Sequence, residues 1–430
     1  MDKGLVVQFV ISTLLRYWLC HSEFKSLFQD RVEISNPINA WKNLVEGVTL
    51  MKDQVNPYDG DIFHESPLIL HMFKFIIGND NPYVQQSIPL IFILCDLLSA
   101  ILLYYMAQSY MIQMVQIEKQ NKHKYAKNIT RILINIEDLV NVPKYVALAY
   151  LYNPFSILNC ICLTSTVFAN LFLCLFFFAF VTQKPILSSI ALTLTVQQNI
   201  YPITLLVPAC VHFHQYKKSW RLFLAGFLLC YSGFLYFCLV LMNQDTSFLA
   251  ATYGFQLTVP NLQPNIGLFW YFFTEMFEHF RVLFIVAFQI NSIFLYVLPL
   301  TLRLYKEPVL VAICLTGLAA VFKSYPCVGD IALYLALMPL CKYLFPFMQQ
   351  GFIVACFFIG CSMFAPTVWH LWIYTRSANA NFYFGVTLAF ATSQIFLLTD
   401  LLFAYLKRDY TLENGIQKTI KGKPARLVLD

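Results

Sequence analysis

Residues 168–181 read FANLFLCLFFFAFV, an apolar run without the strand-like alternation of apolar and polar side chains. Similar runs recur along all 430 residues, and many approach the roughly 20 residues that a helix needs to cross a hydrocarbon core. The chain is 59% hydrophobic and 12% charged, against roughly 25% charged in an average soluble domain. A closed β-barrel is the other structure that spans a bilayer, and it would show short alternating segments. The sequence therefore predicts an all-α fold, a polytopic membrane helical bundle.

The apolar runs predict about twelve transmembrane or re-entrant helices in a single membrane domain, residues 1–430. They lie at residues 4–20, 66–78, 87–114, 145–163, 166–182, 186–214, 220–242, 268–304, 308–322, 331–348, 351–374 and 382–406. The runs 66–78 and 308–322 are short for a span and suit re-entrant or interfacial helices. Gln198, Asn199 and Pro202 interrupt the run 186–214, so we expect it to kink or to split.

Charge is distributed unevenly between the segments that join these runs. Segment 115–144 and the tail 407–430 are rich in Lys and Arg, whereas residues 21–67 contain four basic and eight acidic side chains. Basic flanks mark cytoplasmic loops, so we expect 115–144 and 407–430 in the cytosol and residues 21–67 and 243–267 in the lumen. Lys217 and Lys218 also look cytosolic, which requires one irregular span between residues 145 and 214. The alternative is that this basic cluster is not cytosolic. The basic residues form no extended stripe, so nucleic acid is not expected as a partner.

Thirteen cysteines are present, and most of them lie inside apolar runs, where Cys behaves as a small hydrophobic residue. No Cys-x-x-Cys pair and no zinc-like spacing of Cys and His occurs. The sequence therefore predicts neither a metal site nor a cofactor.

The predicted luminal loop 21–67 is long, acidic and aromatic. Such a loop after the first span is where membrane glycosyltransferases that use dolichol-linked sugars place their chemistry, and the run EG…NPY…ESPLIL resembles the corresponding loop of glycolipid-anchor mannosyltransferases. Their acidic pair would fall at Asp30 and Glu33, but Arg31 lies between these two acids. The formal DxD at residues 59–61 contains Asp-Gly, a strong turn dipeptide, and we interpret it as a solvated turn. The loop therefore resembles that of an enzyme in its length and composition, but it lacks a clear pair of catalytic acids.

A second candidate site lies in the stretch NIGLFWYFFTEMFEHF, residues 265–280. On one helix, Glu275 and Glu278 would share a face at i,i+3, and Glu275 and His279 at i,i+4. Ionisable groups at the mouth of a membrane helix usually serve a site or a partner. An interfacial aromatic belt with acids in the headgroup zone is an equally good interpretation.

A third candidate is the stretch FKSYPCVGD, residues 322–330. Lys323 and Asp330 flank Pro326 and Gly329 between two apolar runs, which suggests a broken helix that lines a cavity. The alternative is that the two charges simply neutralise each other.

The fourth candidate is the stretch WHLWIYTRSANANFY, residues 369–383. Its aromatic residues and Arg376 mark a membrane–water boundary. Asn379 and Asn381 offer amide donors and acceptors, the free N–H groups of a helix start add an anion site, and Arg376 can bind phosphate through two hydrogen bonds. Together they suggest a cradle for a phosphorylated headgroup. A plain N-cap for the last helix is the alternative.

Six long motifs carry a specific resemblance to one family. They are NPY…G…FHESPLI, YLYNPFSIL, YPITLLVPA, NIGLFWYFFTEMFEHF, FKSYPCVGDIALY and LWIYTRSANANFYF. In this order they resemble the PIG-U family, a multispanning subunit of the glycosylphosphatidylinositol (GPI) transamidase of the endoplasmic reticulum. The resemblance runs from residue 1 to the tail.

The resemblance implies a role in a complex rather than an enzyme in its own right. Such a complex cleaves a C-terminal signal from a precursor protein and joins the new carboxyl end to the ethanolamine amine of a GPI lipid. A separate caspase-like subunit would carry the catalytic Cys–His dyad. The chain itself would have a fold like the GT-C-like membrane mannosyltransferases and would bind and present the GPI lipid. Expected partners are the GPI lipid, the other transamidase subunits and membrane phospholipid.

The resemblance also implies roles for particular residues. Asn379 and Asn381 match the family's SANxN lipid-binding segment, and we group Arg376 and Tyr383 with them. Other candidates are Lys217 and Lys218 for a phospholipid headgroup, and Glu275, Glu278, His279 and Asp330 for contacts with the groove or with partners. Two further functions stay open: an active dolichol-phosphate-mannose-dependent GPI mannosyltransferase, and a transporter or scramblase.

Overall fold

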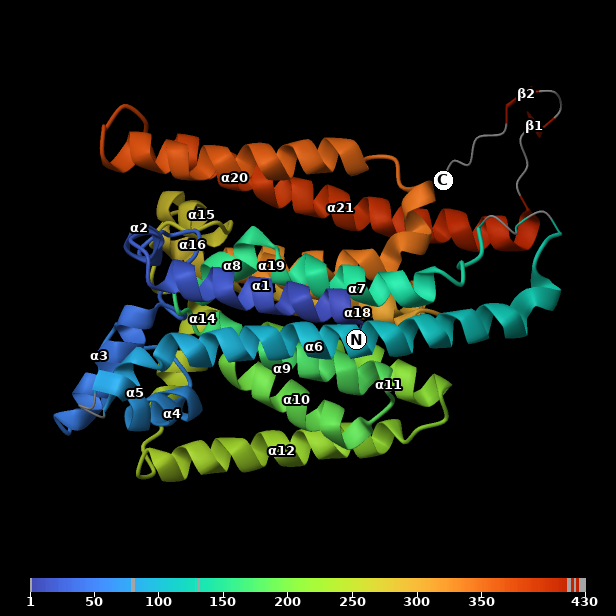
Figure 1. The fold of residues 1–430 in the computed structure, drawn as a ribbon. Coiled ribbons are helices and arrows are strands. Elements are labelled where there is room, and N and C mark those ends of the chain that lie inside the picture. Colours follow the sequence, from blue (N-terminus) through green and yellow to red (C-terminus); the bar gives the residue numbers. More distant parts are fainter. Residues whose placement is uncertain are drawn as a thin grey trace.

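The computed structural model describes residues 2–78, 82–127, 129, 132–415, 419–420 and 423–424, and the fold is a bundle of helices (Figure 1). Seven helical stretches in this described part are long and apolar enough to cross a membrane. They are α1 (Lys3–Cys20), Tyr83–Lys124, α12 (Trp220–Leu241), Glu278–Arg303, Val328–Phe347, α20 (Gly351–Ile373) and α21 (Ala380–Asn414). Shorter apolar helices accompany them: α4 (Pro67–Ile77), α9 (Thr166–Val181) and α18 (Pro308–Phe322). The prediction of an all-α polytopic membrane bundle is confirmed.

Shorter elements complete the chain. The other α-helices are α2 (Phe24–Gln29), α3 (Trp41–Lys52), α5 (Pro82–Gln86), α6 (Ile88–Asn121), α7 (Asp138–Leu151), α8 (Pro154–Ile161), α10 (Pro185–Gln198), α11 (Leu206–Gln215), α13 (Ser247–Leu249), α14 (Phe255–Thr258), α15 (Phe269–Glu275), α16 (Glu278–Ile290), α17 (Val297–Arg303) and α19 (Val328–Leu337). The 3₁₀ turns are η1 (Pro57–Asp59), η2 (Lys122–Lys124), η3 (Tyr201–Leu205) and η6 (Met338–Phe347), and the π turns are η4 (Ala250–Gly254) and η5 (Asn291–Leu295). Two short antiparallel strands, β1 (Thr419–Ile420) and β2 (Lys423–Pro424), lie in the tail.

Proline marks the start of several helices. Pro67, Pro154, Pro185 and Pro308 each occupy the first turn of their helix, where a missing backbone N–H costs nothing and the fixed φ suits the helix. In α8 the preceding residue adds a cap, because the Asn153 side chain accepts a hydrogen bond from the Phe155 N–H at 3.0 Å. Local sequence therefore decides where these helices begin.

The predicted run 186–214 splits into two helices, as the polar residues in it suggested. Helix α10 ends at Gln198, Asn199 has extended backbone angles, and η3 and α11 follow. Figure 1 shows that α11 returns toward the end of the bundle where α10 starts. This is the irregular span that the position of Lys217 and Lys218 requires.

Two other predicted spans are wrong in detail. The run 145–163 is not one helix, because α7 ends at Leu151 and α8 starts at Pro154. The residue before a proline avoids helical angles, and Asn153 is extended at φ −65° and ψ 120°. The run 268–304 is divided at Met276 and Phe277, whose ψ angles of 144° and 133° are also extended.

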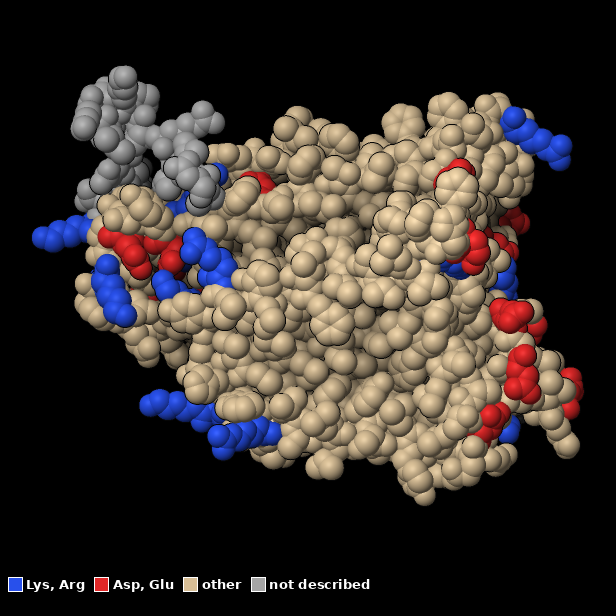
Figure 2. All heavy atoms as spheres, turned by 180° about the vertical axis from the view of Figure 1, so that it is seen from behind, with Lys and Arg blue, Asp and Glu red and all other residues tan. Residues whose placement is uncertain are grey.

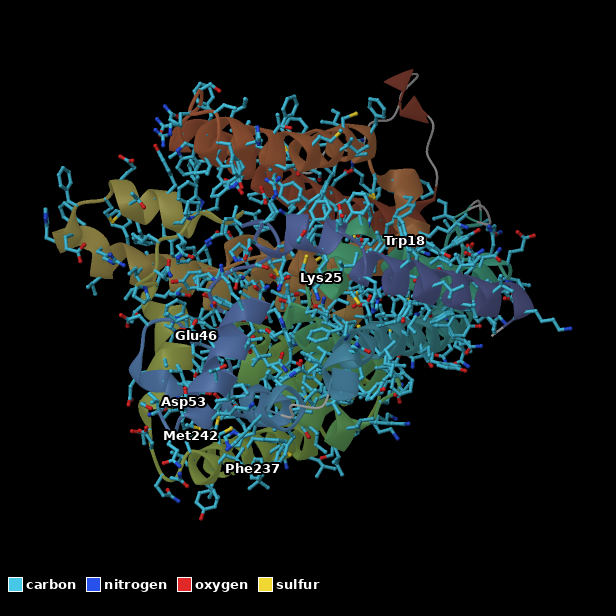
Figure 3. The ribbon with its side chains drawn as sticks, turned by 60° about the vertical axis from the view of Figure 1, so that its left-hand side comes forward. Trp18, Lys25, Glu46, Asp53, Phe237 and Met242 are labelled. Atoms are coloured by element: carbon cyan, nitrogen blue, oxygen red, sulfur yellow. The ribbon has the colours of Figure 1, made fainter. Side chains whose placement is uncertain are left out.

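The two ends of the bundle differ in charge. One end, which we call the acidic end, carries the loop 21–67 and the α20–α21 turn, and the other, the basic end, carries the α11–α12 turn and the end of α21 (Figure 1). Figure 2 shows charged side chains gathered at these two ends, with a nearly uncharged surface between them. The loop 21–67 meets the end of α12, where the Asn56 amide donates to the Asp245 carboxylate. Figure 3 shows Asp53 of this loop and Met242, the residue after α12, on the same side of the molecule. Residues 128, 130 and 131 and most of the tail beyond Gly415 lie outside the described residues.

A buried ion pair fastens the first helix to the rest of the bundle. The Arg16 guanidinium lies 2.7 Å from the Asp96 carboxylate, and both side chains are at most 1% exposed. Arg16 also donates to the Leu151 carbonyl at 2.8 Å, and the Tyr150 hydroxyl donates to Asp96 at 2.8 Å. Because both charges are paired and hydrogen-bonded, the pair can exist inside the bundle. It joins α1, α6 and α7.

Candidate functional site

The last two helices form a hairpin whose turn lies at the acidic end (Figure 1). Asn379 is the N-cap of α21, and its side-chain oxygen accepts hydrogen bonds from the backbone N–H of Asn381 at 3.1 Å and of Phe382 at 3.3 Å. The N-cap interpretation of this segment is therefore confirmed. At the other end of the hairpin, the Asp400 carboxylate accepts from the N–H groups of Gln349 (3.0 and 3.1 Å) and Gln350 (2.8 Å), just before α20 begins.

An open groove of about 530 Å³ runs along this hairpin. Asn379 and Asn381 line its polar end, and its other lining residues are Cys361, Phe364, Phe382, Gly385, Val386 and Ala389. The Asn381 side-chain oxygen accepts a hydrogen bond from the Tyr271 hydroxyl of α15. We call this hollow the hairpin groove. It combines two amide side chains at its mouth with apolar walls.

The other two residues of the predicted lipid site lie outside this lining. Arg376 is exposed in the turn and has a positive φ of 55°. Tyr383 is fully buried behind the groove, where it packs against Trp270, Trp369 and Trp372. Its hydroxyl donates to the Glu33 carboxylate at 3.2 Å. Of the four residues predicted to act together, the structure places Asn379 and Asn381 on the groove itself.

A second hollow of about 170 Å³ adjoins the hairpin groove, because Cys361 and Val386 line both. Its walls are mostly apolar, and Arg31 and Glu33 of the predicted luminal loop also line it. We call it the inner hollow. Burial raises the pKa of Glu33, and the hydrogen bond from Tyr383 opposes this only in part.

The predicted cluster of Glu275, Glu278 and His279 does not form. Glu275 is the last residue of α15 and Glu278 the first of α16, so the extended residues between them remove the expected i,i+3 and i,i+4 relations. All three side chains are exposed at the acidic end. Glu278 lies 3.7 Å from the Arg281 guanidinium.

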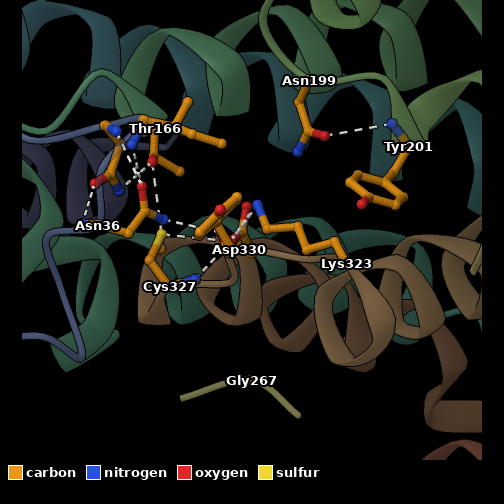
Figure 4. A network of polar contacts seen from close by, with 12 residues as sticks. Asn36, Thr166, Asn199, Tyr201, Gly267, Lys323, Cys327 and Asp330 are labelled. Carbon is orange, nitrogen blue, oxygen red and sulfur yellow. Dashed lines mark hydrogen bonds and ion pairs between the residues drawn. The ribbon is translucent and has the colours of Figure 1, made fainter. Parts of the chain in front are cut away.

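The broken helix at residues 322–330 is confirmed, and both interpretations of its charges hold. Helix α18 ends at Phe322 and α19 begins at Val328, and the Lys323 ammonium lies 2.6 Å from the Asp330 carboxylate (Figure 4). Asp330 also accepts from the Cys327 N–H at 2.9 Å and so caps α19. Two small hollows of about 40 Å³ each meet at this pair. Each is large enough for water molecules.

Polar side chains from four parts of the chain converge on this ion pair, and we call them the polar cluster. Its members include Asn36, Glu65, Asn199, Tyr201, Lys323 and Asp330. The Tyr201 hydroxyl is hydrogen-bonded to the Ser324 hydroxyl at 2.8 Å, and the Asn36 amide donates to the Tyr325 carbonyl at 2.9 Å. The cluster therefore links the loop 21–67 to the break after α10 and to the break between α18 and α19.

Glu65 is one of the members of the polar cluster that the sequence did not predict. It is 2% exposed, its Oε1 has no hydrogen-bond partner in the described chain, and burial raises its pKa to about 7. Its signal in the sequence was its place in FHESPLI, two residues before Pro67, where helix α4 begins.

The other loop acids do not converge. Asp30 is 73% exposed and pairs with Lys42 at 3.3 Å, whereas Glu33 is buried against Tyr383. Asp59 and Asp61 are exposed, as expected for a solvated turn. Among the described residues, no group of three or more His, Cys, Asp or Glu side chains could hold a metal ion.

The basic candidates lie at the far end of the molecule. Lys217 and Lys218 are exposed in the turn between α11 and α12. At the end of α11, the backbone N–H of Lys217 donates to the His214 carbonyl at 3.0 Å, and that of Lys218 donates to the Phe213 carbonyl at 2.8 Å. The neighbouring Arg221 lies over the Trp220 ring at 5.6 Å.

Comparison with known proteins decides the family. The family model described as GPI transamidase subunit PIG-U matches residues 10–390. This chain belongs to the PIG-U family of GPI transamidase subunits. It is 37% identical to the human GPI-anchor transamidase component PIGU over the full length of both chains, and 36% identical to that of Cricetulus griseus. The GPI transamidase component GAB1 of Saccharomyces cerevisiae is 29% identical over 92% of this chain and 93% of its own.

Close packing explains two glycines in the motifs of this PIG-U chain. A Cβ on Gly267, in NIGLFWYFF, would lie 2.6 Å from the Pro326 ring of FKSYPCVGD. A Cβ on Gly329 would lie 2.6 Å from the side chain of Asn159, the residue after YLYNPFSIL, and Asn153 of that motif donates to the Ala332 carbonyl of FKSYPCVGDIALY at 3.4 Å. Three of the motifs that carried the resemblance therefore meet in space around the α18–α19 break.

Proposed function

We propose that this PIG-U chain is a non-catalytic subunit of the GPI transamidase that binds and presents the GPI lipid. The observation that carries the proposal is the hairpin groove, in which two amide side chains stand at the mouth of apolar walls. A glycolipid has the same division, because its hydroxyl-rich headgroup needs hydrogen bonds and its acyl chains need an apolar surface. Asn379 and Asn381 would bind the headgroup, with Arg376 at the exposed turn above them.

The acidic end would face the lumen of the endoplasmic reticulum, and the basic end the cytosol. In this orientation the headgroup of a lipid in the hairpin groove reaches the luminal surface. The chain would then promote transamidation by proximity, since it holds the ethanolamine amine near an acyl-enzyme formed on a separate caspase-like subunit with a Cys–His dyad. No catalytic group is required of this chain.

The exposed candidates suit contacts with other molecules. Glu275, Glu278 and His279 lie at the same end as the groove mouth, and we assign them to the groove entrance and to neighbouring subunits. Lys217 and Lys218 would contact phospholipid headgroups at the cytosolic face. Asp330 is held inside the chain by Lys323, and we assign it to the support of the groove region rather than to a partner.

The test replaces Asn381 with Lys. We expect Asn381→Lys to lower surface display of a GPI-anchored reporter several-fold, because a long cation replaces the amide at the groove mouth, while the transamidase subunits still copurify. The control is Asn414→Lys, the same change at an exposed position at the other end of α21. Normal reporter display in Asn381→Lys cells would overturn the proposal.

An active dolichol-phosphate-mannose-dependent mannosyltransferase is the rival function. It would need the loop acids, so the double change Asp30→Ala and Glu33→Ala tests it. We expect no loss of mannose transfer to GPI precursors, because Asp30 is exposed and Glu33 is buried against Tyr383. A loss of transfer would favour the enzyme.

A further inference from the structure

Arg31 places a cation in a mostly apolar hollow. It lies just after α2 in a tight turn, where its N–H bonds to the Phe28 carbonyl at 3.1 Å and its carbonyl accepts from the Ser35 N–H at 2.8 Å. Its side chain lines the inner hollow, and its Nη1 is buried without a hydrogen-bond partner in the described part of the chain. Among the described residues, it is the one Lys or Arg that lines the inner hollow.

The surroundings of Arg31 compensate its charge poorly. No described carboxylate lies within ion-pair distance of its guanidinium. Glu33 lines the same hollow, but its carboxylate accepts the Tyr383 hydroxyl, and burial raises its pKa more than the nearby Arg31 lowers it. The hydroxyls of Ser362 and Thr387 bond to carbonyls of their own helices at 2.6 and 3.0 Å. Burying part of a cation without a partner is unfavourable, so the site favours an anionic ligand.

The position of the inner hollow next to the hairpin groove indicates what kind of anion would enter. The two share Cys361 and Val386, and the remaining walls of the inner hollow are mostly apolar side chains such as Phe28, Phe155 and Phe390. A free phosphate ion would meet a mainly apolar surface around the guanidinium. A lipid carries its phosphate next to apolar chains, and a guanidinium binds phosphate through two parallel hydrogen bonds.

We infer that the inner hollow is a binding site for the phosphate of a phosphate-bearing lipid, with Arg31 as its ligand and the apolar walls holding the start of an acyl chain. This rests on the proposed function, since the lipid would enter from the hairpin groove. Arg376, at the exposed turn, would contact the outer headgroup, whereas Arg31 would fix the phosphate next to the diradylglycerol.

The experiment compares two lipids with the same acyl chains, one with a phosphoinositol headgroup and one with a free hydroxyl in its place. The intact transamidase complex is purified in mild detergent, and the affinities of dioctanoylphosphatidylinositol and dioctanoylglycerol are measured by thermophoresis. We expect the wild type to bind the phosphatidylinositol about tenfold more tightly, the effect of a charge-assisted hydrogen-bonded pair. Arg31→Gln should remove this preference and leave the affinity for dioctanoylglycerol unchanged, and Arg31→Lys should keep part of it. The control is Arg303→Gln, an exposed arginine at the end of α17, three residues before Lys306, which pairs with Asp409 near the end of α21.

The outcomes separate the two proposals. A preference for phosphatidylinositol that survives in Arg31→Gln would overturn the role of Arg31 while leaving lipid binding intact, and so would equal binding of both probes by the wild type. Failure of both probes to bind would overturn the proposed function as well. Dioctanoylphosphatidylserine distinguishes the source of the phosphate: binding equal to phosphatidylinositol indicates a resident anionic phospholipid, and weaker binding indicates an inositol lipid such as the substrate. Either result, when it is lost in Arg31→Gln, supports a phosphate site at Arg31.

Discussion

Lys323 and Asp330 form the ion pair at the centre of the polar cluster, 2.6 Å apart and only 10% and 15% exposed. Removing one member of a buried pair leaves the other charge unpaired, which costs about 3–5 kcal/mol, whereas removing both costs less. The pair lies at the α18–α19 break, and the other residues that line the two hollows beside it include members of the loop 21–67 and of α9 to η3. Its effect on stability should therefore depend on whether one member of the pair or both are removed.

We expect Lys323→Met to lower the thermal unfolding midpoint of the purified complex strongly. The double variant Lys323→Met with Asp330→Asn should be more stable than Lys323→Met alone, because no charge is then left unpaired. The control is Lys42→Met, which breaks the pair with Asp30 in which the two side chains are 68% and 73% exposed, and it should cost about 1 kcal/mol or less. A double variant less stable than either single variant would contradict this account of the pair.

Glu65 should make stability depend on pH. Burial raises its pKa from 4.5 in the unfolded chain to about 7 in the folded one. The folded state then holds the proton more tightly, so the group favours folding at low pH, and this contribution is lost as pH rises from about 4.5 to about 7. The shift corresponds to about 3 kcal/mol over that window.

Replacing Glu65 with Gln removes this titration. We expect the unfolding midpoint of Glu65→Gln to rise relative to wild type as pH goes from 5 to 8, because only the wild type must bury a carboxylate at high pH. The measurement is a series of thermal unfolding curves of the intact complex. A difference that stays constant, or one that shrinks with pH, would rule out the buried neutral Glu65.

At the scale of elements, helices were more predictable from the sequence than the breaks between them. Long apolar runs predicted the spans, and Gln198, Asn199 and Pro202 predicted the division of 186–214, because they include both polar and helix-breaking residues. The break at Met276 and Phe277 contains neither Gly nor Pro, so only packing in the folded protein reveals it. The polar mouth of the hairpin groove was predictable as a set of residues in one turn. The inner hollow was not, since it joins the loop after α2 to helices near the other end of the chain.

The attachment of α20 to α21 depends on Asp400. Its carboxylate accepts the backbone N–H groups of Gln349 and Gln350 inside the hairpin, and Asp400 is only 4% exposed. Asp400→Ala leaves these N–H groups without a partner and should cost about 1–3 kcal/mol. We expect a lower unfolding midpoint together with reduced GPI attachment, because the groove lies between the two helices.

The matched control for Asp400 is its neighbour Thr399. Thr399 is exposed and bonds only to carbonyls of its own helix, at 2.8 and 3.1 Å, so Thr399→Ala should change stability by no more than about 0.5 kcal/mol. Asp400→Asn keeps one acceptor and should fall between the two. Equal effects of Asp400→Ala and Thr399→Ala would show that the cap does not hold the hairpin.

At the scale of the whole molecule, the chain is a membrane bundle with unequal sides. Its core packs α6, α7, α9, α18 and α19 together, whereas α12, α16 and α20 expose long apolar faces. Such faces need no polar cover within a bilayer. The hairpin groove and the inner hollow both lie at the acidic-end half of α20 and α21. They bring the amide groups of Asn379 and Asn381 and the guanidinium of Arg31 next to this apolar surface. We therefore place the lipid at the hairpin rather than in the buried core.

Photocrosslinking tests this placement most directly. Gly385 lines the hairpin groove, and a Cβ added there would have no heavy atom within 4 Å, so p-benzoylphenylalanine fits; Gly233 of α12 has the same open surroundings away from the groove. In microsomes with labelled GPI precursor, we predict a crosslink at Gly385→p-benzoylphenylalanine that is strongly reduced by Asn381→Lys, and only background at Gly233→p-benzoylphenylalanine. Equal labelling at the two positions, or labelling at Gly385 that is unaffected by Asn381→Lys, would contradict a GPI site in the groove.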